Sequence, residues 1–137
     1  MIGKRQYKKL DSYSLDTHSL VWYIRGQKTL SSKAEKIVRK VFEEEFICYI
    51  SVMAILEAFY ISLKHKNFIF SKFLESIKRP NIKVIPFDNK ILVQCFKLPV
   101  GMDIHDRIVV ATAIATNTPL VTKDKVLRSL FPLETIW

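Results

Sequence analysis

The sequence predicts an α/β protein in which a parallel β-sheet is covered by helices on both faces. Short apolar runs, such as residues 46–50 and 119–121, alternate along the chain with segments of helical character. Runs that are apolar at successive positions are typical of strands buried on both faces of a sheet. Because parallel strands need crossover connections, which are usually helices, this alternation favours a parallel sheet.

The predicted elements follow each other closely along the chain. Strands are expected at residues 13–15, 46–50, 82–86, 119–121 and 135–137, the last of them at an edge of the sheet. Ser31 or Ser32, Ser51 and Asp88 precede helical segments and can cap their first turns. Helices are expected through 21–24, from the Ser31/Ser32 cap to about 45, and at 52–64, 68–78, 89–96, 104–116 and, as a short one, 125–129.

Length and composition indicate one ordinary domain. The chain has 137 residues, of which 49% are hydrophobic, and only three are glycines. We assign residues 1–12 to a basic N-terminal extension and residues 13–137 to a single domain. Cys48 and Cys95 stand among apolar neighbours, which predicts buried core thiols. The chain has neither the apolar run of a signal peptide nor a membrane-spanning stretch, so we expect a cytoplasmic protein without a membrane partner.

The charge balance points toward a polyanionic partner. Lys and Arg number 22 against 13 Asp and Glu, a net charge of +9. Basic residues concentrate in the first ten positions and again between residues 64 and 83, where Glu75 is the only acid. Charge alone does not distinguish RNA from DNA, and exposed helix faces that carry charge for solubility remain the alternative.

Four acidic residues lie where the chain leaves a strand or enters a helix. Asp16 directly follows the first predicted strand, and Asp124 closely follows the fourth. Both are therefore expected at the carboxyl edge of the sheet, where ligands bind in open α/β folds. Glu57 lies about one and a half turns into the helix 52–64, and Asp106 lies at the start of the helix 104–116.

Glu57 is the most informative of the four acids. It is the only charged side chain between residues 52 and 63, so that its helix reads as apolar all round and hence buried. A buried lone carboxylate is costly unless it is paired or binds a cation. A salt bridge to a buried Arg, or a narrow exposed stripe, would also account for it. Asp16, Asp106 and Asp124 each have an alternative role at a helix N-terminus or in a turn.

Clustered carboxylates favour a hard divalent cation. Oxygen ligands suit Mg²⁺ or Mn²⁺ better than zinc or copper, and a carboxylate-bound ion beside a basic surface suggests phosphodiester cleavage. No Cys/His spacing for zinc is present, and His18, His65 and His105 are scattered along the chain without a motif.

Four segments, in order, resemble the acidic motifs of PIN domains. They are Tyr-Ser-Leu-Asp-Thr-His through Trp22, Ile-Ser-Val up to Glu57, Asp-Ile-His-Asp-Arg from Asp103, and Leu-Val-Thr-Lys-Asp ending at Asp124. The Asp-Thr-His opening and the Asp-x-x-Asp-Arg segment are similar to those of VapC-type toxins of toxin–antitoxin pairs. The resemblance covers residues 13–137.

The resemblance implies a three-layer PIN-like fold with a parallel sheet of about five strands between helices. It implies a Mg²⁺-dependent endoribonuclease, Mn²⁺ being an alternative ion, that forms a homodimer and is held inactive by a small antitoxin. The catalytic and metal-binding residues carried over by motif are Asp16, Glu57, Asp106 and Asp124. Candidates for polar support are Thr17, Thr122 and Asp103, of which Asp103 is also the expected N-cap of the helix 104–116.

Two features depart from the family pattern. The extension 1–12 precedes the usual start, and Ile104-His105 stands where Pro-Phe is more usual. His105 is interpreted as a surface residue or as a substrate contact. The aromatic segment 55–73 is interpreted as an antitoxin groove, a dimer face or plain core. The alternative to an enzyme is a non-catalytic nucleic-acid or protein-binding module that retains the fold.

Overall fold

The computed structural model describes residues 11–130 and 132–137, and most of the predicted N-terminal extension lies outside them. The first strand begins at Ser12, which the sequence had placed at the end of that extension. The strands are β1 (Ser12–Leu15), β2 (Ile47–Ser51), β3 (Ile82–Ile85), β4 (Leu120–Val121) and β5 (Thr135–Ile136). The helices are α1 (Thr17–Ile24), α2 (Ser32–Phe42), α3 (Val52–Lys64), α4 (Phe70–Ser76), α5 (Asn89–Phe96), α6 (Ile104–Ala115) and the 3₁₀ helix η2 (Leu127–Ser129).

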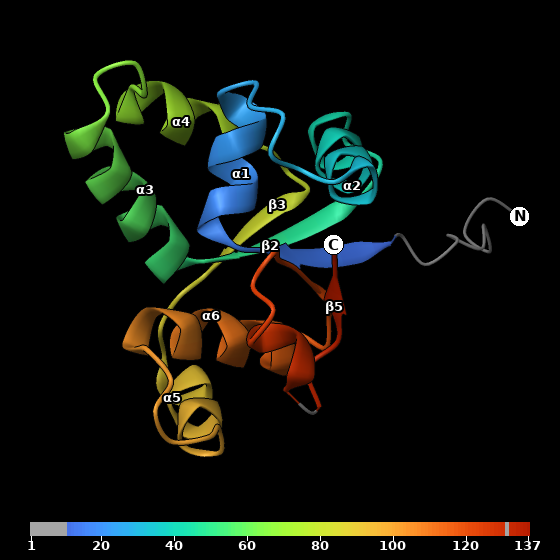
Figure 1. The fold of residues 1–137 in the computed structure, drawn as a ribbon, viewed down its shortest axis with the longest axis vertical. Helices are drawn as coiled ribbons and strands as arrows, with labels where there is room; N and C mark the ends of the chain where they lie inside the picture. The colour runs from blue at the N-terminus through green and yellow to red at the C-terminus, as the bar shows by residue number, and fades with distance from the viewer. Residues whose placement is uncertain (1–10, 131) are drawn as a thin grey trace, which may run out of the picture.

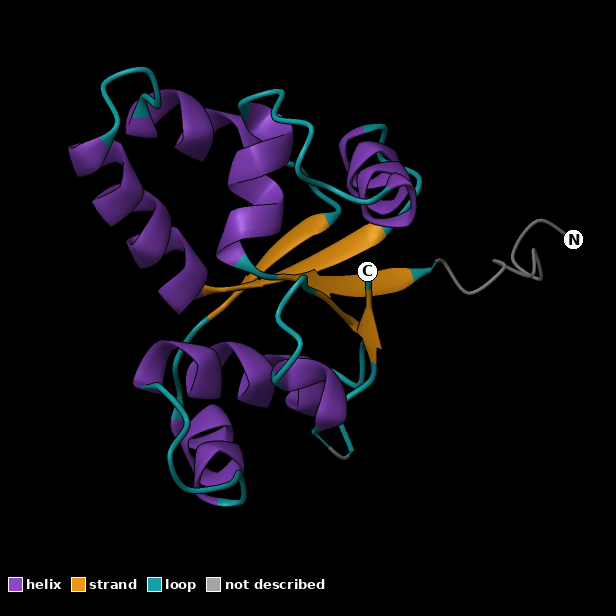
Figure 2. Cartoon of the chain, in the orientation of Figure 1, coloured by secondary structure: helices purple, strands orange, loops and turns teal. Residues whose placement is uncertain are grey.

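The strands form one five-stranded sheet in the order β3-β2-β1-β4-β5, and every neighbouring pair is parallel. Figures 1 and 2 show three layers, in which α1 to α4 cover one face of the sheet and α5 and α6 cover the other. This arrangement confirms the predicted α/β class. The chain adds β2 and β3 on one side of β1 and β4 and β5 on the other, so the direction of winding changes between β1 and β4.

Each face of the sheet has its own hydrophobic core. The core under α1 to α4 includes Leu20, Val38 and Phe73, and the core under α5 and α6 includes Ile91 and Val110. Apolar side chains on both faces explain why the strands are apolar at successive positions. No described helix is both long and apolar enough to cross a membrane.

The two cysteines confirm the prediction of buried thiols. Cys48 belongs to the core under α1 to α4 and Cys95 to the other core, and neither forms a disulfide. Burial raises the pKa of both thiols, that of Cys48 most strongly, because a thiolate is poorly solvated in an apolar interior. Neither sulfur is therefore placed to act as a nucleophile.

Helix α2 ends earlier than predicted, at Phe42 instead of about residue 45. The chain must turn there to enter β2, and Glu44 adopts a left-handed conformation with φ of 62°. The side-chain amide of Asn81 donates hydrogen bonds of 2.7 Å to the carbonyl oxygens of Val41 and Phe46, one on each side of the turn. A residue 35 or more positions away thus holds the turn, which local patterns do not reveal.

Helix α3 corrects one expectation. Only Ala54 and Ala58 are buried in it, whereas the apolar side chains Leu56 and Leu63 are 47% and 64% exposed. The interpretation of this helix as buried all round was wrong, because only one face of it packs on the core, through Ala54 and Ala58 together with the partly buried Ile55 and Ile61. In the aromatic segment, Phe68 and Phe73 are core residues, Phe70 is half-buried, and Phe59 and Tyr60 are exposed.

Candidate metal-binding site

A cleft of about 440 Å³ lies at the point where the winding of the sheet changes direction. Ligand sites of open α/β folds occur at such switch points, beyond the carboxyl ends of the strands. The structure brings together there all four acids expected from the sequence. The lining includes Asp16, Glu57, Asp106 and Asp124 together with Thr17 and Thr122, and we call it the acidic cleft.

Asp16 and Asp124 are held by backbone donors at the ends of β1 and β4. Asp16 is the N-cap of α1, and its Oδ1 accepts a 2.9 Å hydrogen bond from the Ser19 amide. The Oδ1 of Asp124 accepts from the amides of Val126 at 2.8 Å and Leu127 at 3.3 Å. The capping and turn roles weighed for these residues are therefore real, and they fix the carboxylates at the mouth of the cleft.

Thr122 supports Asp124 from below. Its side chain is fully buried, and its Oγ1 accepts a 3.1 Å hydrogen bond from the Asp124 amide. The Thr122 side chain therefore stabilises the backbone turn that follows β4. Thr122 acts on the cleft by shaping the backbone that carries Asp124.

Glu57 reaches the cleft from the second turn of α3. Its Oε1 accepts a 2.9 Å hydrogen bond from the hydroxyl of Thr17, a buried residue that also lies 3.4 Å from the Ala54 carbonyl oxygen. The Glu57 side chain is 28% exposed, and among the described residues its only ion-pair contact is His105, with Nδ1 3.9 Å from Oε2. The alternative of a salt bridge to a buried Arg is thus not found among the described residues.

The pKa of Asp106 is the clearest sign that the carboxylates lie near one another. Burial raises the pKa of its carboxyl group, and the negative charges of Asp124, Asp103, Glu57 and Asp16 raise it further. Asp106 lies on the first turn of α6, whereas the other carboxylates come from three further parts of the chain. Negative charges that gather in one cleft favour any cation that enters it.

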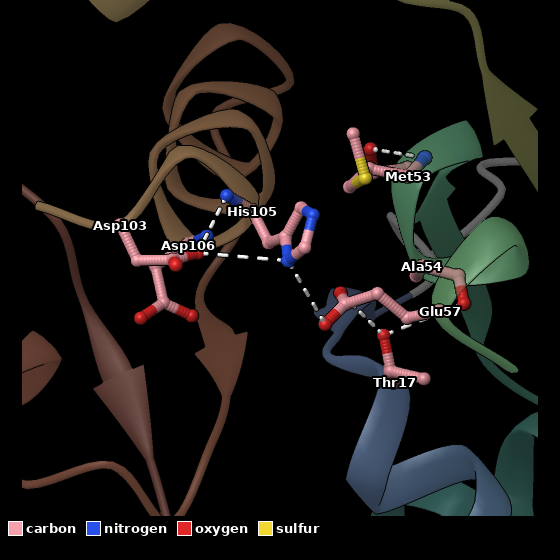
Figure 3. A network of polar contacts seen from close by, with 8 residues as sticks. Thr17, Met53, Ala54, Glu57, Asp103, His105 and Asp106 are labelled. Atoms are coloured by element: carbon pink, nitrogen blue, oxygen red, sulfur yellow. Dashed lines mark hydrogen bonds and ion pairs between the residues drawn. The ribbon is translucent and has the colours of Figure 1, made fainter. Parts of the chain in front are cut away.

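Asp103 and His105 lie at the rim. Asp103 caps α6, as predicted, by accepting hydrogen bonds from the amides of His105 at 2.7 Å and Asp106 at 3.4 Å. Figure 3 shows the His105 ring between α6 and α3, with Nδ1 3.6 Å from Asp103 Oδ1 and facing Glu57. His105 has a half-exposed side chain, as a surface residue would.

A family model described as "PIN domain" matches residues 13–130. The chain belongs to the PIN domain family. The match includes all four acids of the cleft. A comparison with curated protein sequences finds no match.

Solved structures of low sequence identity share the PIN fold. VapBC2 from Rickettsia felis, bound to a DNA fragment from its promoter, superposes with a TM-score of 0.68 at 19% identity, covering 91% of this chain and 97% of that one. A toxin–antitoxin complex from Klebsiella pneumoniae superposes with a TM-score of 0.66 at 17% identity, covering 91% of this chain and 96% of that one. DNA-bound VapBC from Salmonella typhimurium superposes with a TM-score of 0.65 at 16% identity, covering 92% of this chain and 97% of that one.

The oxygen ligands of this PIN domain fit Mg²⁺, but its acids are widely spaced. Among the described residues, no three His, Cys, Asp or Glu side chains are close enough together to hold one metal ion. Mg²⁺ usually keeps several waters and is bound through one or two carboxylates and substrate phosphates. Such an ion suits this cleft better than zinc, which takes three or four direct protein ligands.

Further residues line the site without a role assigned to them from the sequence. Trp22 and Lys123 line the acidic cleft, with Lys123 Nζ 5.9 Å from the centre of the Trp22 ring. Arg107 faces away from the cleft and donates to the carbonyl oxygens of Cys95, Leu98 and Pro99, which ties α6 to the end of α5. Trp22, Lys123 and Arg107 all stand inside the four motif segments, and this position is the signal that could have drawn attention to them.

Proposed function

We propose that this PIN domain is a Mg²⁺-dependent endoribonuclease of the cytoplasm that acts as the toxin of a toxin–antitoxin pair. The observation that carries the proposal is the convergence of four carboxylates from separate parts of the chain in one cleft. The net charge of +9 supports an RNA substrate, because the acidic cleft is a local exception on a basic chain. Mn²⁺ is the alternative ion.

Asp16, Glu57, Asp106 and Asp124 would hold Mg²⁺, one or two of them directly and the others through water molecules that the ion keeps. When bound, the ion supplies an activated water and stabilises negative charge on the phosphate. Thr17 orients the Glu57 carboxylate through its 2.9 Å hydrogen bond, and Thr122 holds the turn that carries Asp124. Lys123 lies beside the cleft, where its ammonium group suits a substrate phosphate.

The experiment is cleavage of a mixed single-stranded RNA in Mg²⁺ buffer by the wild type and by Asp16→Asn and Asp106→Asn. We expect each variant to lose roughly 100-fold or more in rate, because even outer-shell partners of a metal cost about 10–100-fold. Chelation of the metal should abolish cleavage. Asp88→Asn is the matched control, because Asp88 caps α5 outside the cleft and Asn caps equally well.

Unchanged cleavage in Asp16→Asn and Asp106→Asn, with both proteins folded, would contradict the proposal. Absence of any cleavage by the wild type, together with no heat of Mg²⁺ binding in a calorimetric titration, would favour the alternative of a non-catalytic binding module.

We further propose self-association through the exposed apolar surface of α5 and the segment that precedes α6. Phe96, Val100 and Ile104 are 74%, 97% and 64% exposed and line an apolar cavity of about 400 Å³. Exposed apolar surface of this kind marks interaction sites. Light scattering should show a homodimer that Phe96→Glu and Val100→Glu convert to a monomer. A wild type that is monomeric at high micromolar concentration would overturn this assignment.

For the antitoxin we propose the outer face of α3 as its docking site. Leu56 and Leu63 are exposed there, and Ile69, which follows the helix, is 48% exposed. An amphipathic partner helix would cover such a face. A small protein encoded next to this chain should co-purify with it and suppress cleavage, and Leu63→Glu should release it. Inhibition that is unaffected by Leu63→Glu would rule out this face.

A further inference from the structure

A second, smaller cavity adjoins the acidic cleft. Its volume is about 210 Å³, and its lining includes all three histidines of the chain, His18, His65 and His105, together with Glu57, Tyr60 and Lys64. We call it the histidine cavity. His18 and Glu57 line both cavities, so the two lie next to each other. The sequence had presented these histidines as scattered, since they stand 40 or more positions apart.

Three helices build the histidine cavity. Glu57, Tyr60 and Lys64 stand at positions i, i+3 and i+7 of α3, which places them on one face of the helix. His65 is the C-cap of the same helix, His18 is the second residue of α1, and His105 is the second residue of α6. The same helices carry acids of the cleft, so the two cavities are positioned by one framework.

The side chains of the cavity are accessible and of mixed chemistry. Tyr60 is 57% exposed and the His105 side chain is 49% exposed, while Lys64 is an exposed cation. Apart from Glu57, which it shares with the acidic cleft, the cavity has no acid in its lining. A ligand that enters it therefore meets aromatic faces, a cation and imidazole donors.

The acidic cleft itself carries aromatic and cationic side chains of the same kinds. The rings of His18 and Trp22 are stacked with centroids 5.4 Å apart, and Lys123 lies over the Trp22 ring. Aromatic and cationic groups thus line both the acidic cleft and the histidine cavity. Grooves for single-stranded nucleic acid combine a cationic path with aromatic side chains on which unpaired bases stack.

We propose that the histidine cavity binds one unpaired nucleotide of the RNA, next to the phosphodiester that enters the acidic cleft. The base stacks on Tyr60, and the phosphate lies near Lys64 and His65. The cavity is smaller than the roughly 300–1,000 Å³ of ordinary small-molecule pockets, which suits one base and not a stacked pair. This inference rests on the proposed ribonuclease function and specifies a single-stranded substrate.

The test measures binding apart from cleavage. Fluorescence anisotropy of a labelled single-stranded RNA octamer is recorded in the Asp16→Asn background, with and without Tyr60→Leu. We expect Tyr60→Leu to weaken binding about 10-fold, in line with the stacking of one base on one aromatic ring. Val84→Ala is the control, because Val84 is 44% exposed on β3 and lines neither the histidine cavity nor the acidic cleft. A blunt RNA duplex should show no dependence on Tyr60.

A second variant keeps the test independent of Tyr60. Lys64→Gln should lower the slope of log affinity against log salt by about 0.7, the value expected for one lost contact with a single strand. Equal octamer affinities with and without Tyr60→Leu, or equal dependence on Tyr60 for duplex and single strand, would overturn the subsite. So would a Tyr60→Leu effect confined to binding of a protein partner. A wild type that cleaves no RNA, while octamer binding still depends on Tyr60, would remove the proposed function and keep the subsite.

Discussion

Arg107 offers a direct test of how the structure positions the acidic cleft. Its guanidinium bridges α6 to the C-terminal end of α5, with Nη1 3.0 Å from the Cys95 oxygen and 3.1 Å from the Leu98 oxygen, and Nη2 2.6 Å from the Pro99 oxygen. The perturbation is Arg107→Met, which keeps most of the aliphatic bulk and removes every donor. Arg107→Lys retains the charge without the planar fork.

The three hydrogen bonds determine how much free energy of unfolding Arg107→Met should lose. The bonds to Cys95 and Leu98 are partly buried, and the bond to Pro99 is exposed and adds little. A hydrogen bond to a charged group contributes about 1.5–3 kcal/mol net, with the lower value expected where water can replace the donor. We therefore expect Arg107→Met to lower the free energy of unfolding by about 2–4 kcal/mol. For a domain of this size, this corresponds to a fall in Tm of about 10 °C.

The assay is urea unfolding followed by the fluorescence of Trp22 and Trp137, which contact each other edge to face near the cleft. The midpoint should fall while the m-value stays constant. Arg107→Lys should lose about half as much, because one ammonium group cannot reach three carbonyl oxygens in the same geometry. A loss below about 0.5 kcal/mol for Arg107→Met, the size of an ordinary surface substitution, would refute the reasoning.

Three other results should follow from the structure. Asp106→Asn should raise the Tm in metal-free buffer at pH 7, because the raised pKa of Asp106 means that its ionised form destabilises the folded state. This gain should disappear as the pH falls below the ordinary aspartate pKa of about 3.9, and Mg²⁺ should stabilise the wild type more than the variant. Glu44→Gly should stabilise the protein by about 0.5 kcal/mol in urea titrations because of its φ of 62°, whereas Glu43→Gly, at φ of −84°, should destabilise it. A thiol reagent should label Cys48 only at the rate of unfolding, and fast labelling would contradict its burial.

Local pattern was sufficient for most of the fold. The helices at 52–64 and 89–96 begin and end where predicted. Ser51 and Asp88 cap their first turns, and the chain becomes extended at His65 after the first of them. The parallel sheet followed from strands that are apolar at successive positions. Where prediction of an element failed, as at the end of α2, the determining contact came from Asn81, far along the chain.

The candidate site was predicted for reasons of unequal quality. Asp16 and Asp124 were placed correctly because the end of a parallel strand defines an edge of the sheet. Glu57 was placed in the site although its helix is not buried all round, and its carboxylate is held by a hydrogen bond from Thr17 and contacted by His105. The pKa of Asp106 depends on acids from four parts of the chain, and such electrostatic coupling has no signature in a local pattern.

The sequence by itself determined which elements form and which carboxylates stand at their ends, since capping, periodicity and strand burial depend on residues close together along the chain. Tertiary structure alone decided which distant side chains share a cavity. His18, His65 and His105 form no motif in the sequence, yet three helix ends bring them to one cavity beside the acidic cleft. The physical reason is that helix packing sets which ends meet, and packing depends on contacts between residues far apart along the chain.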